Sequence, residues 1–591
     1  MMRVLVVLMS LLFLNTSISS QSLPKPKAIS RPLDYEFLAA PDSLGNRAPL
    51  KTPKTERTGE LKLPYPVVFV HGLNSNSATW DTTTAWMEEQ YDFSFGGRFD
   101  FCLNYDEDYN KANKYFNTSD ADMALFTSTI VPGDYYFVNF DVGTNGLVSP
   151  GYWDDGFVRS NQSAIAKQGY AVKWAIESVL QQTGRDKVIL FGHSMGGLAS
   201  REYIQNPENW QSDGKHHVAK LVTTGTPHGG SNSTAYGLGF LAGLDEETEA
   251  VRDLRRTYYY SLDSGVYLYG GMEVQGDTTM DDNLGVDFYN VDVNCDGTEG
   301  QLIVGLNKKT LVRNIDFTCI IGNCDGCWAA DNGIGDGVVN NYCANLKNYY
   351  PDLDAEVFFY NASALAEIHT VLPTLNFENM LGLDEPDKLE LAYTVDTSIN
   401  YTGFITPQAK EPEEYDYDYY EFTMPYNGNI NITVNNSVLS NFTLCVFDTL
   451  FNSIGFVEQS FGSTIVHFNK YAPQGKYYIR ISAIADENSF LYPYNFSIET
   501  SPATSVDMLS MNTLGFNAYP NPASDKIWVN LGQQQSFTNH LELVNVLGEL
   551  IERYSIKNNV TEIDISNLEK GIYFLRTNVN NKQIVKRFIK E

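Results

Sequence analysis

The segment that most restricts the fold is residues 192–196, Gly-His-Ser-Met-Gly, which directly follows the apolar run at residues 188–191. A stretch compatible with a helix, residues 197–204, comes next. A run that is apolar on both faces is typical of a strand at the buried centre of a parallel sheet. Small residues around a serine let the backbone turn sharply from strand to helix. The pattern therefore predicts a strand, a tight turn and a helix, with Ser194 at the turn.

A second motif, residues 70–73 (Val-His-Gly-Leu), ends another apolar run, residues 67–70. A serine hydroxyl is a weak nucleophile, and its attack on a carbonyl group leaves negative charge on the carbonyl oxygen. Two preorganised backbone N–H groups can hold that charge. We expect these oxyanion-hole donors to be Leu73 and Met195, and we expect His71 to brace the loop rather than to act as a base.

Apolar runs alternate with helical periods over residues 61–395. Apolar residues between 165 and 179 fall on one face of a helix, and Gly184 suits its C-terminal cap. A third apolar run lies at residues 221–223. Strands that alternate with helices predict the α/β class, here a doubly wound, mostly parallel sheet with helices on both sides.

Three motifs, each at the end of an apolar run, resemble the lipase/esterase branch of the α/β-hydrolases. They are residues 70–73, residues 192–197 and residues 225–231, Gly-Thr-Pro-His-Gly-Gly-Ser. The resemblance covers roughly residues 60–380 and implies the α/β-hydrolase fold with a serine nucleophile. It also implies that His228 is structural. A Cys-rich insertion at about residues 270–345 departs from the family pattern, so the substrate class stays open.

The catalytic acid and base are expected downstream of Ser194, because hydrolases of this fold order their triad as Ser, acid, His. Asp336 lies in Gly-Asp-Gly-Val-Val, a context that suits a tight turn after a strand, and Asp331 is the alternative. Of the later histidines, His369 alone falls inside the first domain. We therefore expect His369 to be the general base and Asp336 to be the carboxylate that orients it.

The N-terminus and the overall charge indicate a secreted or cell-surface protein. Residues 1–20 read as a signal peptide, with a basic start and an apolar run at 4–14 that is short for a bilayer span. Residues 21–60 are expected to be a leader segment. The length of 591 residues predicts about three domains, and the net charge of −31 argues against a nucleic-acid partner.

Five of the seven cysteines lie between residues 295 and 343. In an exported protein, this clustering predicts one or two disulfides that hold a long insertion. The alternative is that Cys324 and Cys327 form half of a zinc or redox site. The sequence has no second Cys-x-x-Cys pair and no nearby histidine to complete such a site.

A truncated calcium loop is a candidate metal site inside the same insertion. Asp292, Asn294 and Asp296 alternate before a glycine, as in the start of an EF-hand loop. The twelfth position would be Ile303, which cannot ligate a metal. A turn rich in Asp and Asn is therefore the alternative to a structural calcium ion.

Two small all-β sandwich domains are predicted after the first domain. Residues 408–500 resemble the small jelly-roll domains found C-terminal to secreted hydrolases and peptidases, on residues 418–422 and 477–481. Within them the acidic run at 411–418 is expected to be a solvated face, with a calcium site as the alternative. Residues 501–513 read as a linker.

The last module, residues 514–591, resembles the C-terminal sorting domain of the type IX secretion system. The motifs are residues 519–523 (Tyr-Pro-Asn-Pro-Ala), residues 545–549 (Asn-Val-Leu-Gly-Glu), residues 568–574 and the basic tail. The resemblance implies that the type IX machinery is a partner, and that the chain is exported through the outer membrane.

The combined expectation is a secreted serine hydrolase that cleaves carboxylic esters through an acyl-enzyme. No organic cofactor or catalytic metal is required, and lipid esters are the first choice of substrate. The aromatic stretch at residues 236–260 is either a lid or core. An amidase or peptidase on the same fold, and a surface binding protein with a vestigial hydrolase domain, remain as alternatives.

Overall fold

The computed structural model describes most of the chain. The described residues are 23, 25–31, 36–41, 44–53, 61–105, 122–148, 160–231, 249–254, 257–259, 273–275, 305–324, 334–362, 368–406, 415–435, 442–459, 463–484, 492–503, 516–530, 540–546, 548–555, 560–579 and 582–591. The signal peptide predicted at 1–20 and the linker predicted at 501–513, apart from its first three residues, lie outside these ranges. Among the described residues, no helix combines the length and apolar composition needed to cross a bilayer.

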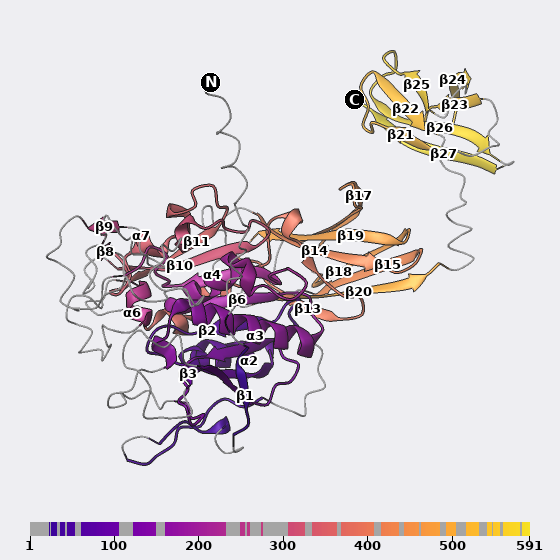
Figure 1. Cartoon of the computed structure of the whole chain (residues 1–591). Helices are drawn as coiled ribbons and strands as arrows, with labels where there is room; N and C mark the ends of the chain where they lie inside the picture. The colour runs from indigo at the N-terminus through magenta and orange to yellow at the C-terminus, as the bar shows by residue number, and fades with distance from the viewer. Residues whose placement is uncertain are drawn as a thin grey trace, which may run out of the picture. The chain divides into compact units, whose positions relative to one another are not determined.

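The first part of the chain is built on a nine-stranded sheet, with the strand order β1-β4-β3-β5-β2-β6-β7-β10-β11 (Figure 1). All neighbouring pairs in it run parallel except β3 and β4. The strands are β1 (Lys27–Ile29), β2 (Val67–Val70), β3 (Phe95–Tyr105), β4 (Asp122–Phe126), β5 (Tyr135–Asn139), β6 (Val188–His193), β7 (Val218–Thr224), β10 (Asp316–Cys324) and β11 (Glu356–Ala362). The strands predicted at 67–70, 188–191 and 221–223 are confirmed, and every residue of β2, β6 and β7 is buried.

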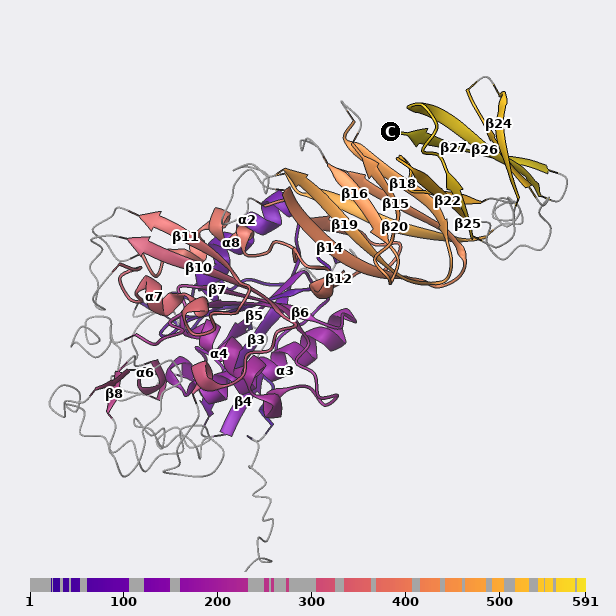
Figure 2. The same cartoon turned by 90° about the horizontal axis from the view of Figure 1, so that it is seen from above.

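Helices cover both faces of this sheet, as the doubly wound pattern predicts: α3 and α4 lie on one face, and α2 and α8 on the other (Figure 2). The helices are α2 (Asp81–Tyr91), α3 (Ile165–Thr183), α4 (Met195–Gln205), α6 (Glu249–Leu254), α7 (Asn341–Ala344) and α8 (Asn376–Leu381). Helix α3 ends as predicted at Gly184, whose φ of 69° lets its N–H bond to the carbonyl of Leu180 at 2.9 Å. A two-stranded sheet of β8 (Thr257–Tyr259) and β9 (Glu273–Gln275) lies outside the main sheet.

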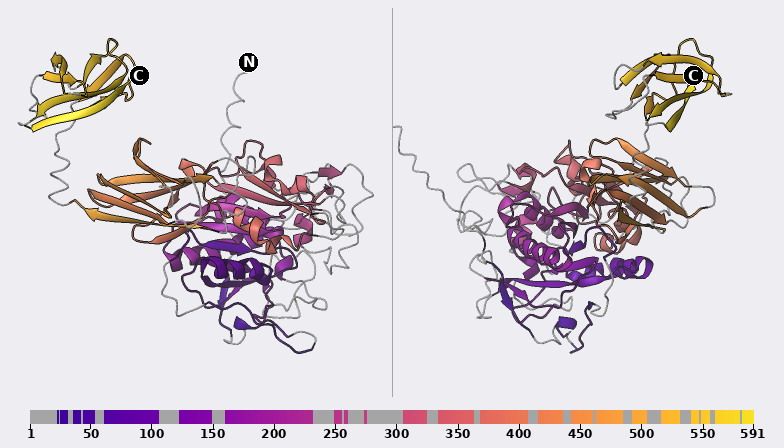
Figure 3. Two further views of the ribbon diagram at one scale, coloured as in Figure 1. Left: turned by 180° about the vertical axis from the view of Figure 1, so that it is seen from behind. Right: turned by 90° about the vertical axis from the view of Figure 1, so that its right-hand side faces the viewer.

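A β-sandwich follows, formed by the five-stranded sheet β12-β14-β19-β16-β17 and the four-stranded sheet β13-β20-β15-β18. Figure 3 shows its strands from two further sides. The strands are β12 (Tyr393–Thr394), β13 (Asn400–Gly403), β14 (Tyr415–Met424), β15 (Gly428–Asn435), β16 (Thr443–Phe447), β17 (Ser453–Glu458), β18 (Ile465–Ala472), β19 (Gly475–Ile484) and β20 (Tyr494–Pro502). The sandwich begins earlier than the predicted residue 408, because β12 and β13 pair with β14 and β20.

The sandwich and the nine-stranded sheet belong to one compact unit. The hydroxyl of Tyr65, just before β2, accepts a hydrogen bond from the N–H of Thr394 at 2.9 Å. The ring of Phe404 packs against that of Tyr91, with centroids 5.1 Å apart. The boundary between the first two predicted domains is therefore a packed interface.

Strand β14 contradicts the predicted solvated face for Asp416 and Asp418, the two acidic residues of the run that the structure describes. Its side chains alternate between exposed and buried, and Asp416 and Asp418 fall on the buried side with 0% exposure. The period of two along a strand puts both aspartates on the same face as the core residues Tyr420 and Phe422. The acidic composition of the run concealed that alternation.

The C-terminal module has its own core and belongs to a second compact unit. It consists of the three-stranded sheet β21-β22-β25 and the four-stranded sheet β24-β23-β26-β27. The strands are β21 (Asn517–Tyr519), β22 (Lys526–Asn530), β23 (His540–Val544), β24 (Leu550–Ser555), β25 (Val560–Asp564), β26 (Gly571–Val579) and β27 (Lys582–Lys590).

Candidate active site

Ser194 lies at the junction between β6 and α4, in a strained backbone conformation with φ 52° and ψ −126°. A residue with a side chain in such a sparsely populated region costs on the order of 1–3 kcal/mol and persists when its surroundings enforce it. Two hydrogen bonds hold the turn: Ser194 N–H donates to Thr224 O at 3.0 Å, and Gly197 N–H donates to Ser194 O at 3.1 Å. The turn also needs a small residue at 196, where a Cβ would lie 2.3 Å from Val70 O.

Asp336 and His369 form a buried pair at the end of the sheet where β6, β7 and β10 finish. His369 Nδ1 lies 2.7 Å from Asp336 Oδ2, and the two residues are 6% and 1% exposed. A carboxylate only accepts, so the proton of this bond is on Nδ1, which leaves Nε2 able to take a proton. The other carboxylate oxygen, Oδ1, accepts the N–H groups of Val338 at 2.9 Å and Val339 at 2.7 Å.

The backbone also ties the histidine to the acid. The carbonyl of Asp336 accepts the N–H groups of Ile368 at 2.9 Å and His369 at 3.0 Å. These bonds fix the short segment that carries the imidazole, independently of the side-chain contact. The competing carboxylate, Asp331, lies outside the described residues.

Contacts through neighbouring residues bring this pair to the serine turn. Gly225 follows Thr224, whose carbonyl accepts the N–H of Ser194. A Cβ on Gly225 would lie 3.1 Å from His369 Nδ1 and 3.0 Å from Asp336 Oδ2. His193, next to the serine, lies with its ring centroid 4.8 Å from that of His369. Residues 194, 336 and 369 therefore share one region of the molecule.

The loop after β2 packs directly on the serine. A Cβ on Gly72 would lie 2.8 Å from Cβ of Ser194, so Leu73 follows a residue in contact with the turn. Among the described residues, no backbone hydrogen bond is donated by the N–H of Leu73 or of Met195.

His71 braces this loop as a neutral imidazole. Its Nε2 accepts the N–H of Phe140 at 2.8 Å, and its Nδ1 lies 2.9 Å from the carbonyl of Gly72. Burial lowers the pKa of His71 to about 4, so the ring is uncharged near neutral pH. These contacts agree with the prediction from the motif that His71 braces the loop.

His193 is a site residue that the sequence reasoning missed. Its Nε2 lies 3.0 Å from the carbonyl of His369 and so holds the backbone of that residue. Burial lowers the pKa of His193 well below its usual range. Its position directly before the serine was the only signal available, and the partner lies 176 positions away.

His228, in the third motif, is fully buried and contacts two polar side chains. Its Nε2 lies 3.2 Å from Thr223 Oγ1 and its Nδ1 lies 3.3 Å from Arg201 Nη1. Burial, with the nearby charge of Arg201, lowers the pKa of His228 well below its usual range. Its environment is that of a structural histidine.

Part of the sequence-based proposal falls outside the described residues. This holds for the calcium-loop residues Asp292, Asn294 and Asp296, for Cys295 and Cys327, and for most of the stretch at 236–260. Cys319 and Cys343 are buried free thiols, so the one or two disulfides predicted for the cluster do not include them. Cys324 is disulfide-bonded, and the pairing of Cys295 and Cys327 stays a prediction.

Two family models match parts of the chain. Residues 157–257 match a PGAP1-like alpha/beta domain, and residues 517–591 match a secretion system C-terminal sorting domain. The first range contains β6, Ser194, α4 and β7, and the second contains all the strands of the C-terminal module. The chain therefore carries an α/β-hydrolase domain followed by a type IX sorting domain, which indicates export to the cell surface or beyond.

Solved structures similar to this chain include several hydrolases. The product of the gene lin2722 from Listeria innocua is 13% identical over 55% of this chain and 95% of its own, with a TM-score of 0.29. A lipase-esterase related protein from Clostridium acetobutylicum is 11% identical, over 55% and 94%, with a TM-score of 0.25. Naproxen esterase from Bacillus subtilis is 8% identical, over 56% and 86%, with a TM-score of 0.26. No curated protein matches.

Proposed function

We propose that the protein is an exported serine hydrolase that cleaves carboxylic esters through a covalent acyl-enzyme. The observation that carries the proposal is the strained Ser194 turn beside a buried pair of His369 and Asp336. This constellation has the parts that an activated serine needs, namely a serine at a sharp turn, a histidine in the same region and a carboxylate that orients the histidine.

In the proposed reaction, Nε2 of His369 takes the proton from the Ser194 hydroxyl as its oxygen attacks the ester carbonyl. Asp336 keeps the other ring proton on Nδ1 and stabilises the imidazolium that forms. The N–H groups of Leu73 and Met195 hold the oxyanion. The imidazolium then protonates the departing alcohol, and a water molecule activated by the same base releases the acid and regenerates the serine.

Esters are proposed over amides from the lipase/esterase resemblance of the sequence motifs. Lipid esters are the first candidates. The signal peptide at 1–20 and the sorting domain would place this activity outside the cell, where the substrate is also expected.

A panel of p-nitrophenyl esters of graded acyl length, run beside peptide p-nitroanilides, tests the proposal. We expect turnover of the esters that vanishes in Ser194→Ala, and much slower turnover of the amides. Amide turnover that exceeds ester turnover would assign the same residues to an amidase. A purified, folded chain without either activity would favour a binding role. Labelling of Ser194 by a fluorophosphonate reports the nucleophile independently of the substrate chosen.

A further inference from the structure

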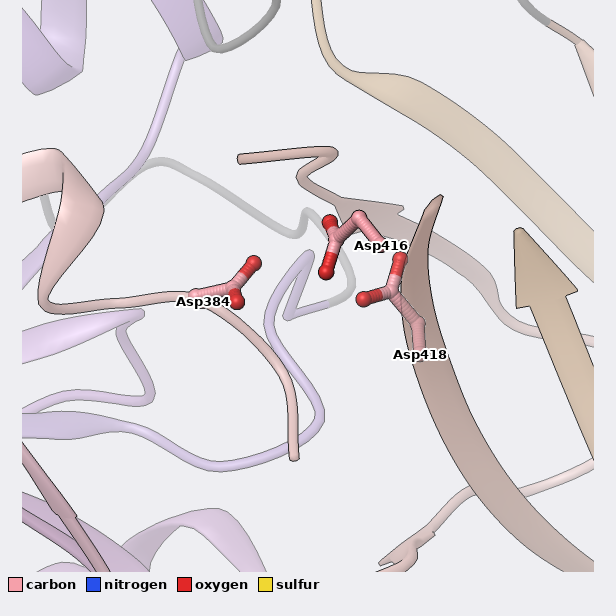
Figure 4. Close-up of side chains that lie close together, drawn as sticks. All are labelled: Asp384, Asp416 and Asp418. Atoms are coloured by element: carbon pink, nitrogen blue, oxygen red, sulfur yellow. The ribbon is translucent and has the colours of Figure 1, made fainter. Parts of the chain in front are cut away.

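Three carboxylates converge between the hydrolase domain and the sandwich, away from Ser194. Asp384 lies in the segment after α8, and Asp416 and Asp418 lie on the buried face of β14 (Figure 4). One oxygen from each carboxylate lies within 4.8 Å of the others. The three residues are 1%, 0% and 0% exposed. The figure shows the three groups turned toward one another.

Burial of three like charges at this distance is unfavourable unless a positive charge joins them. A buried lysine lies beside the cluster, but its charge is paired with another carboxylate: Lys220 Nζ lies 2.7 Å from that of Asp316 and donates to the backbone carbonyl of Asp384 at 2.8 Å.

The hydrogen bonds of the cluster leave oxygens unused on two of its members. The carboxylate of Asp416 accepts the N–H of Thr406 at 2.7 Å, and Asp418 Oδ2 accepts the hydroxyl of Tyr494 at 2.5 Å. Oδ1 of Asp384 and Oδ1 of Asp418 are buried without a hydrogen-bond partner in the described structure. If protons shared between the carboxyl groups stabilised the cluster instead of a cation, these oxygens would be paired, because each protonated carboxyl donates a hydrogen bond.

We propose that Asp384, Asp416 and Asp418 bind a calcium ion that joins the hydrolase domain to the sandwich. Calcium binds oxygen ligands at about 2.3–2.6 Å, so two of its ligand oxygens lie at most roughly 5 Å apart. The spacing within the cluster satisfies this limit. Carboxylates alone suit a hard cation rather than zinc, which favours nitrogen and sulfur ligands. Water molecules complete the coordination.

A pocket beside the cluster offers a route for the ion. It is lined by Lys388, Leu391 and five acidic residues, all of which precede the sandwich in the chain: Asp316, Asp354, Glu356, Glu385 and Asp387. Glu385 directly follows Asp384 in the chain. A cleft lined by one sign of charge concentrates counterions, so this pocket favours entry of a divalent cation.

The ion would connect the sandwich to the segment that also carries the proposed base. Asp384 follows His369 by 15 positions, through α8. Calcium binding would therefore stabilise the packing of β14 on this segment in the calcium-rich medium that an exported protein meets. Calcium binding at this site plays no part in the proposed hydrolytic mechanism.

Thermal unfolding of the full chain, with EDTA and with increasing CaCl2, tests the proposal. We expect a saturable rise of about 3–5 °C in Tm when calcium exceeds its Kd about 100-fold. Asp384→Asn and Asp418→Asn should each remove the rise. In EDTA these variants should melt at or above the wild-type temperature, because each removes an uncompensated charge. Asp352→Asn, at an exposed position, is the matched control that keeps the rise.

A double variant separates this site from the calcium loop in the insertion. Asp292→Asn combined with Asp296→Asn should keep the rise in Tm. Equilibrium dialysis with 45Ca should show one ion fewer per chain in Asp384→Asn than in the wild type. A wild type without a calcium-dependent Tm, or variants at 384 and 418 with an unchanged rise, would overturn the proposal. A rise that is lost only in the double variant would assign calcium to the insertion instead.

Discussion

His369 Nδ1 lies 2.7 Å from Asp336 Oδ2, although the two residues are 33 positions apart and both are almost fully buried. The remaining oxygen of Asp336 is saturated by two backbone N–H groups, so the carboxylate has one orientation available. A carboxylate fixed in this way sets the tautomer and the direction of the imidazole. In the proposed mechanism, proton transfer at Ser194 would therefore depend on Asp336 as well as on His369.

Replacing the proposed nucleophile is expected to remove activity without unfolding the chain. Ser194→Ala should lower kcat on p-nitrophenyl esters by about 10⁴- to 10⁶-fold. Its Tm should stay within about 2 °C, because only one hydroxyl is lost. Ser200→Ala is the matched control, since Ser200 lies in the same helix and donates to Gly196 O at 2.8 Å. Equal losses in both variants would indicate damage to the helix rather than loss of a nucleophile.

Replacing the acid tests the orientation of the imidazole. Asp336→Asn should lower kcat by roughly 10³- to 10⁴-fold near neutral pH, because an amide at this position favours the wrong tautomer of His369. KM should change little, and part of the activity should return at high pH. Asp331→Asn, the competing carboxylate, should keep nearly full activity. The reverse ranking of the two variants in steady-state kinetics would transfer the role to Asp331.

A methyl group beside the pair should disturb catalysis more than stability. In Gly225→Ala, at a φ of 59°, the Cβ would meet Leu372 Cδ1 at 2.8 Å, Asp336 Oδ2 at 3.0 Å and His369 Nδ1 at 3.1 Å, so we expect at least a tenfold loss in kcat/KM. Gly184→Ala is the control, because its φ is also positive, at 69°, but nothing lies within 4 Å of the added atom. It should lower Tm through backbone strain and leave kcat/KM unchanged.

The pH dependence of stability should carry a contribution from His71. Burial lowers the pKa of this residue to about 4 from an ordinary value of 6.5, so between these values the unfolded chain binds a proton that the folded chain does not. The free energy of unfolding should therefore fall by up to about 3 kcal/mol as the pH drops from roughly 6.5 to 4. Urea unfolding of the wild type and of His71→Gln measures this, because the variant lacks the titration. A difference in the free energy of unfolding between the wild type and His71→Gln that stays constant over this pH range would contradict the assignment.

Export should depend on the last module and not on catalysis. A chain that ends at residue 513 should remain inside the outer membrane of its native host, whereas the full chain should reach the surface or medium. Fractionation followed by immunoblotting measures the distribution. The Ser194→Ala chain serves as the control and should be exported normally. Export of the truncated chain would show that residues 517–591 are dispensable for sorting.

Local sequence patterns were sufficient for the parts of the fold that depend on short-range physics. An apolar run, a glycine-flanked serine and an amphipathic stretch decide strand, turn and helix within about 20 residues, so β6, Ser194 and α4 were predictable. The cap at Gly184 and the match of the last module were also predictable. The cap joins residues that are close in the chain, whereas the last module pairs distant strands, such as β22 with β25, and was predicted from its motifs.

The tertiary structure alone decided which distant groups meet. The contact of His193 with His369, the early start of the sandwich at β12 and the convergence of Asp384 with β14 all depend on sheet order and register. The acidic run illustrates the reason: its charge suggested a solvated surface, but its alternation buried Asp416 and Asp418 once β14 packed against a second layer. Burial is a property of the surroundings that the whole chain builds, and no short segment specifies those surroundings.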